Sequence, residues 1–208
     1  GGVIDEYKIN ESSLSVDLSG DLFGVSVANI GDLDGDGVTD IVVGEDFNDD
    51  GGTTSNGAVW ILFMNSNGSV KGDYKINESR FGNGNELNGN KFGKAVAGIG
   101  DLNGDGVEDI AVGEYLDDDG SSDNGAVWIL FLNTTGGVID EYKINEAAFG
   151  NGNELNGDHF GRAIANLGDL NGDGITDIAV GEEYNDDGGT NNGAVWILFL
   201  NTSGGVND

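Results

Sequence analysis

Nearly the same acidic loop occurs three times in this chain of 208 residues, and its side chains are of the type that binds a hard metal ion. Counted from its first aspartate, each loop has an aspartate or asparagine at positions 1, 3, 5 and 9 and glycine at positions 4 and 6. Calcium takes six to eight oxygen ligands at about 2.3–2.6 Å, so a loop that binds it must curl tightly. Glycine at position 6 permits the unusual backbone angles, and the carbonyl at position 7 adds a fifth protein ligand. The predicted ligands are Asp32, Asp34, Asp36, Val38 and Asp40; Asp101, Asn103, Asp105, Val107 and Asp109; and Asp169, Asn171, Asp173, Ile175 and Asp177.

The three loops predict about three calcium ions, one for each loop, in sites that differ from an EF-hand. An EF-hand loop ends in a bidentate glutamate at position 12 and is followed by a helix. Here position 12 is a valine (Val43, Val112 or Val180) inside a short apolar run that is typical of a strand.

The overall charge excludes some partners and favours others. The chain has 38 acidic and 8 basic residues and a formal net charge of −30. Nucleic acids and anionic membrane surfaces both select basic surfaces, so neither is an expected partner. A compact chain with this charge repels itself unless cations neutralise part of it. Three Ca²⁺ ions would supply +6 of the 30 charges and leave −24.

Composition also argues against catalysis and against membrane insertion. The chain has no cysteine and one histidine, His159, so the familiar pairs of nucleophile and base are nearly excluded. We therefore expect a protein that is not an enzyme. The longest apolar run, 126–132, is far shorter than the ~20 residues that a membrane helix needs.

A repeat of about 68 residues organises the whole sequence. Trp60, Trp128 and Trp196 recur at spacings of 68 residues, and each repeat contains runs that predict four strands. In the second repeat these strands begin at Phe92 and at Asp109 and extend over 125–132 and 138–145, with the acidic loop between the first two. Small antiparallel sheets covered on both faces by copies of themselves are typical of an all-β propeller, and the alternative is a linear stack of sheets.

The motifs resemble those of a known family. Phe23-Gly24, Phe92-Gly93 and Phe160-Gly161 precede the acidic loops, and a Val-Gly-Glu run follows each loop. The chain resembles the FG-GAP repeats of integrin α-subunit propellers and their microbial relatives, although its third motif is Val-Gly-Glu. The resemblance implies FG-GAP-type β-propeller blades, calcium binding, a location outside the cell or at its surface, and a role in adhesion or recognition.

The repeat boundaries predict two complementary ends. We expect an orphan outer strand in residues 1–10, blade 1 in 11–77, blade 2 in 78–145, and blade 3 in 146–208 without its own outer strand. Three blades are too few to close a ring, since propellers have 4–8. Two chains can exchange terminal strands, residues 3–10 on the open third blade, and close a ring of six blades. Otherwise chains join head to tail into a fibre, or these residues are part of a longer propeller.

The function expected from these features is that of an extracellular, calcium-binding structural or adhesive repeat protein that assembles with itself. The alternative is a propeller that binds a glycan or an extracellular protein. Five Asn-x-Ser/Thr sequons are candidate glycosylation sites: Asn10, Asn67, Asn77, Asn133 and Asn201.

Three further features have simple structural interpretations. We interpret a second acidic cluster after each Val-Gly run as a solvated loop, with a second cation site or an acidic rim that faces a polymer as the alternatives; it includes Glu45, Glu114 and Glu182. The tryptophans are expected in the core, His159 on the surface, and residues 82–89 and 150–157 in connectors rich in turns.

Overall fold

The structure of the chain is a computed structural model. It describes residues 2, 5–14, 16, 18, 20–49, 55–80, 87, 89–119, 122–149, 155–186 and 189–207. The first part of the expected orphan strand, Val3 and Ile4, lies outside these residues, as does most of the two connectors 82–89 and 150–157.

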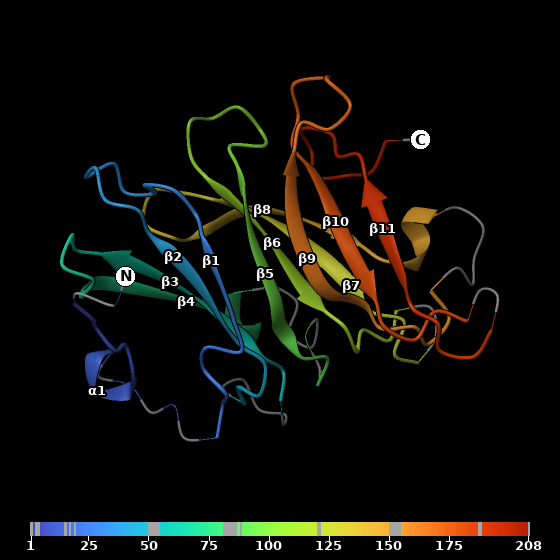
Figure 1. Cartoon of the computed structure of the whole chain (residues 1–208), viewed down its shortest axis with the longest axis horizontal. Coiled ribbons are helices and arrows are strands. Elements are labelled where there is room, and N and C mark those ends of the chain that lie inside the picture. The colour runs from blue at the N-terminus through green and yellow to red at the C-terminus, as the bar shows by residue number, and fades with distance from the viewer. Residues whose placement is uncertain are drawn as a thin grey trace.

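The described residues form eleven strands and three short helices (Figure 1). The first repeat contains α1 (Glu11–Leu14), β1 (Ser26–Asn29), β2 (Ile41–Glu45), β3 (Ala58–Met64) and β4 (Val70–Ile76). The second contains η1 (Glu78–Arg80), β5 (Phe92–Gly100), β6 (Asp109–Glu114), β7 (Ala126–Leu132) and β8 (Val138–Ile144). The third contains η2 (Glu146–Phe149), β9 (Phe160–Gly168), β10 (Asp177–Glu182) and β11 (Ala194–Leu198). None of these helices has the length and hydrophobicity needed to cross a membrane.

Each repeat forms one antiparallel sheet whose strands pair in sequence order. The first two sheets have four strands, β1-β2-β3-β4 and β5-β6-β7-β8, and the third has β9, β10 and β11. Val206 bridges Leu200 where β8 begins to pair with β7 in the second sheet, so the third sheet contains only the start of a fourth strand. The all-β fold of FG-GAP-type blades is confirmed, and the three sheets stand in a row without closing into a ring (Figure 1).

The core lies between neighbouring sheets. One cluster of buried side chains combines Val59 and Ile61 of β3 with Val96 of β5 and Val112 of β6. A second cluster joins the second and third sheets in the same way. Every residue of β3 and β7 is buried, as expected for strands whose two faces are both covered. In β11 partly buried and exposed residues alternate up to the buried Leu198, because no described sheet covers its outer face.

The Phe-Gly motif holds each sheet against the one before it. Phe92 is fully buried and bridges Gly57 of the first sheet, and its amide donates a hydrogen bond of 3.0 Å to the Asn56 carbonyl. The carbonyl of Gly93 approaches Gly44 so closely that a Cβ at residue 44 would lie 1.9 Å from it. Only glycine fits at such a contact between backbones. The junction of the second and third sheets repeats these contacts with Phe160, Asn124 and Gly113.

The aromatic residues follow the expectation in part. Trp60 and Trp128 are buried in β3 and β7, which confirms their place in the core. The expectation for His159 was wrong, because its side chain is only 15% exposed. The imidazole packs 5.2 Å from the Tyr115 ring and 4.5 Å from the Tyr184 ring, measured between centroids, at the junction of the second and third sheets.

Candidate metal centres

The three acidic loops occupy equivalent positions, each connecting the first two strands of its sheet. The loop of the first sheet is closed by backbone hydrogen bonds between Asp40 and its neighbours Ile30 and Gly31, at 3.1 and 2.6 Å. In the other two sheets the pairs Gly100–Asp109 and Gly168–Asp177 close the loop. The strand pairing therefore fixes both ends of every loop.

The first aspartate of each loop organises the turn. Asp101 accepts hydrogen bonds from the amides of Gly104, Asp105 and Gly106, at 2.8, 3.0 and 2.8 Å. Asp169 accepts the same three bonds in the third loop, and Asp32 accepts those from residues 36 and 37 in the first. The backbone thus curls around one carboxylate, which places the side chains of positions 3 and 5 beside it.

The last aspartate connects the loop to the third strand of the sheet. Asp40, Asp109 and Asp177 are fully buried. Asp109 accepts hydrogen bonds from the amides of Leu102, 2.9 Å, and Leu132, 3.1 Å, so one carboxylate joins the loop to the end of β7. Burial raises the pKa of Asp40, and it raises the pKa of Asp109 to about 6, because the charged carboxylate loses water.

The residues of the first loop fit a calcium ion. Oxygens of Asp32, Asp34 and Asp40 lie within 4.8 Å of one another. Two ligands at about 2.3–2.6 Å from one ion are separated by at most about 5 Å, so these oxygens can share an ion. All the donors are hard oxygens, which suits calcium.

Lys71 is a feature of the first loop that the sequence analysis missed. Its ammonium forms ion pairs with Asp34, 2.8 Å, and with Asp36. Ile139 occupies the equivalent position of the second sheet, so no ammonium approaches that loop from there. The first loop has four carboxylates at the ligand positions, and each of the others has three because position 3 is an asparagine. With the lysine counted, −4 + 1 gives −3, equal to the charge of the three carboxylates at the ligand positions of each other loop.

The interpretation of the second acidic cluster as a solvated loop was wrong for its glutamate. Glu45 and Glu114 are fully buried and Glu182 nearly so. In each sheet the glutamate accepts a hydrogen bond from the tryptophan indole of the third strand, at 3.0, 2.6 and 2.8 Å. Burial shields these carboxylates from water. The sequence does contain a signal for the network, because Glu, Trp and Lys recur at equivalent positions of the first two repeats.

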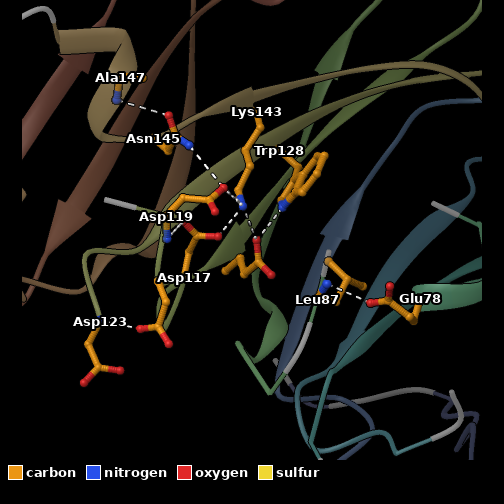
Figure 2. A network of polar contacts seen from close by, with 11 residues as sticks. Glu78, Leu87, Asp117, Asp119, Asp123, Trp128, Lys143, Asn145 and Ala147 are labelled. Atoms are coloured by element: carbon orange, nitrogen blue, oxygen red, sulfur yellow. Dashed lines mark hydrogen bonds and ion pairs between the residues drawn. The ribbon is translucent and has the colours of Figure 1, made fainter. Parts of the chain in front are cut away.

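A lysine on the fourth strand completes this network. Lys143 lies 3.6 Å from Glu114 and 2.8 Å from Asp119, and it also pairs with Asp117 (Figure 2). Burial raises the pKa of Glu114, and the Lys143 ammonium opposes that rise. Lys75 forms the equivalent ion pair with Glu45 in the first sheet, at 3.2 Å. The Lys143 side chain is only 13% exposed, so this lysine lies mostly inside the network and not in solvent.

Calcium binding by the second loop should weaken below about pH 6. Calcium needs the Asp109 carboxylate in its charged form, so protons compete with the ion once the pH falls below the raised pKa of Asp109. At pH 5 the affinity should be about ten times lower than at pH 7. The measurement is a calorimetric calcium titration of a double variant, Asp32→Asn with Asp169→Asn, which keeps only the second loop intact. Equal affinities at the two pH values would contradict the expectation.

The same pKa shift has the opposite effect on the metal-free fold. The pKa of Asp109 in the folded chain lies above its ordinary value, so the protonated form is favoured by folding. Its contribution to the free energy of unfolding is fully present below the ordinary pKa and is lost as the pH rises through about 6.

Comparison with known proteins places these motifs in a family. The family model of the FG-GAP repeat matches residues 23–62, 92–130 and 160–198, which together make up more than half of the chain. Each matched range begins at the phenylalanine of the Phe-Gly motif and ends in the third strand of its sheet.

Several relatives are integrin α subunits. Over 163 residues the chain is 35% identical to integrin alpha-PS5 of Drosophila melanogaster, which covers 78% of this chain and 15% of the relative. It is 29% identical over 169 residues to integrin alpha-4 of Xenopus laevis, covering 80% and 15%. It is 35% identical over 107 residues to integrin alpha-2 of Mus musculus, covering 51% and 9%. The chain therefore spans less than a fifth of the length of these relatives. The three matched repeats each contain one antiparallel sheet and one acidic loop of the same kind, and the chain belongs to the FG-GAP repeat family.

Proposed function

We propose that this chain is a calcium-stabilised structural and adhesive repeat module of the cell surface or the extracellular space, without enzymatic activity, that assembles with further copies of itself. The observation that carries the proposal is the position of the buried aspartate in each loop. Asp109 accepts hydrogen bonds from Leu102 within the loop and from Leu132 at the end of β7. An ion bound to this carboxylate would connect the loop and the third strand of the sheet.

The chemistry of the loops supports a structural role for the ion. Five protein ligands leave few positions for a substrate, whereas a catalytic metal keeps an open one. Outside the loops, the single histidine is packed between the rings of Tyr115 and Tyr184. Neither site supplies a general base beside a reactive nucleophile.

Two considerations support a location outside the cell. The integrin α relatives make an adhesion-related role the closest analogy. Calcium loops of extracellular modules bind with a Kd of about 10⁻⁴–10⁻³ M, so loops of that affinity would be filled outside the cell, where calcium is abundant. If the protein is glycosylated, Asn67 is the most accessible sequon, since it is exposed in the turn between β3 and β4. Asn133, in the equivalent turn between β7 and β8, is less accessible because it is only partly exposed.

The test is the number of calcium ions bound at equilibrium. We expect three per chain, falling to two in Asp109→Asn, which preserves the shape of the side chain and removes its charge. Glu141→Gln is the matched control, because Glu141 is an exposed acid of β8 outside the loops, and it should still bind three. A chain that binds no calcium would refute the proposal.

A glycan array separates the proposal from its alternative. The module that we propose gives no saturable signal from any glycan. Saturable binding that survives when assembly is prevented would instead identify a glycan-binding propeller.

A further inference from the structure

The third sheet exposes the face that its two predecessors use to contact a following sheet. Val59 of β3 and Val127 of β7 are 0% exposed because the next sheet covers them, whereas Val195, their equivalent in β11, is 69% exposed. Ile197 is likewise exposed, although Ile129 at the same place in β7 is buried. We call this surface of β11, which includes Val195 and Ile197, the acceptor face. It is apolar and lies on an edge strand, and soluble proteins usually cover such a surface.

The first sheet exposes the complementary face. Val27 of β1 is 59% exposed, and its equivalent in the second sheet, Val96, is 7% exposed because it packs against the first sheet. Gly24 of the first Phe-Gly motif is exposed too. We call this surface of the first sheet, which includes Val27 and Gly24, the donor face. Its residues are those that fit the acceptor face of the third sheet.

Residues 5–10, before α1, already lie where the fourth strand of a preceding sheet would lie. In the second and third repeats, a tyrosine of the preceding fourth strand packs on a turn glycine. A Cβ added at Gly136 would lie 3.0 Å from Tyr74 Cβ, and one at Gly204 would lie 3.0 Å from Tyr142 Cβ. A Cβ added at Gly68 would lie 3.2 Å from Tyr7 Cβ. Tyr7 thus occupies the same position relative to the first sheet.

From these three observations we infer that the acceptor face binds a second copy of this chain, through the donor face and the N-terminal segment of that copy. The inference rests on the self-assembly in the proposed function and identifies the surfaces that carry it. In the second sheet Tyr142 pairs with Ile129 and Ile144 with Val127. The same register places Tyr7 of the second copy opposite Ile197, and Ile9 opposite Val195. Residues 6–10 then continue the fourth strand that Val206 begins.

Charge complementarity fixes this register. In the first two sheets the lysine beside the tyrosine reaches the buried glutamate and lies over the tryptophan ring, with Nζ 4.9 Å from the Trp60 centroid and 5.1 Å from that of Trp128. In the third sheet Glu182 and Trp196 form the same hydrogen-bonded pair, 2.8 Å apart. Lys8 follows Tyr7 in the sequence, so the second copy brings this ammonium to Glu182.

Polar groups at the rim of the acceptor face match as well. Asn124 receives hydrogen bonds from the following repeat, from the Phe160 amide at its carbonyl and from the Gly157 amide at its side chain, both 2.9 Å. Asn192 is the equivalent residue of the third repeat, and it is exposed. The corresponding donors of the second copy are the amides of Phe23 and Gly20. The new contact therefore repeats a junction that this chain forms twice internally.

The contact is head to tail, so each added copy presents a fresh acceptor face. Two copies have six blades, a number within the 4–8 at which propellers close, and a chain of copies that does not close forms a fibre.

The experiment measures mass in solution by light scattering with calcium present. The wild-type chain should form dimers or longer assemblies, and Gly181→Ala should be monomeric. A Cβ at Gly113 would lie 2.0 Å from the Gly161 carbonyl, and one at Gly181 would meet the Gly24 carbonyl of the second copy in the same way. Gly72→Ala is the matched control, because a Cβ there has only Phe63 within reach, at 3.7 Å, and it should assemble normally.

A mixing experiment tests the polarity of the contact. Val27→Asp blocks the donor face and Gly181→Ala blocks the acceptor face, so each variant alone should be monomeric. Mixed in equal amounts, they should form a dimer with a single contact, because each retains the face that the other lacks. A monomeric wild-type chain, or a mixture without dimers, would overturn the inference.

A separate measurement tests the calcium-stabilised module of the proposed function. The stabilisation of monomeric Gly181→Ala by calcium tests the loops without assembly. If calcium raises its unfolding temperature while the wild-type chain is monomeric, the inference fails and the calcium-stabilised module remains.

Discussion

Removal of calcium with EGTA should lower the thermal unfolding midpoint of the chain by about 20 °C. At a calcium concentration about 100 times the Kd, each site adds about 2.7 kcal/mol to the free energy of unfolding. Three independent sites add about 8 kcal/mol, and in a chain of this size 1 kcal/mol shifts the midpoint by about 2–4 °C. The structural reason is the charge of each loop, because without the ion its carboxylates repel one another around a buried aspartate.

Single variants should divide this effect among the loops. Asp105→Ala and Asp173→Ala should each remove about a third of the calcium-dependent shift. Asp140→Ala, which changes an exposed aspartate of β8, should leave the shift intact. Differential scanning calorimetry with and without EGTA provides the measurement, and a midpoint that EGTA does not move would show that the loops do not hold stabilising ions.

Gly113→Ala should destabilise the chain by about 3 kcal/mol or more, whereas Gly181→Ala should change its stability by less than about 1 kcal/mol. A Cβ at either position would lie 3.3 Å from the Cβ of an alanine in its own sheet, Ala95 or Ala163. The two sites differ in the neighbouring sheet, since a Cβ at Gly113 would also lie 2.0 Å from the Gly161 carbonyl. The second and third sheets must separate to accommodate it, and the core between them loses its packing.

Denaturant unfolding measures this difference, with Val27→Asp included in both proteins so that assembly does not contribute. Equal stability of the two variants would mean that the close approach of the sheets is not required for the fold.

The sequence predicts what lies within one repeat better than what joins two. The acidic loops fall between the first and second strands as predicted, because glycine spacing and alternating carboxylates are local signals. The Phe-Gly motif was recognised only by resemblance. Its physical role depends on Gly44 and Gly57, which lie more than thirty residues away on another sheet. No local pattern reveals a contact that forms only when two sheets stack.

Charged residues at the junctions and edges were the hardest to place. The repeated glutamate in the Val-Gly-Glu run has the appearance of a solvated loop residue, and it is buried because the indole of Trp60 or Trp128 and a lysine of the fourth strand reach it. Lys71 approaches the first acidic loop only because β4 runs beside that loop in space. His159 lies between two tyrosines from different sheets. Each position is set by long-range packing, to which residue type alone gives little guidance.

The two internal junctions are formed by equivalent glycines, asparagines and phenylalanines, so neighbouring repeats contact each other in the same way at both boundaries. A row that gained one whole repeat would need no new kind of contact between sheets, because the two junctions of this chain are built alike. We therefore expect longer rows to arise by duplication of whole repeats, with the contacts between sheets unchanged.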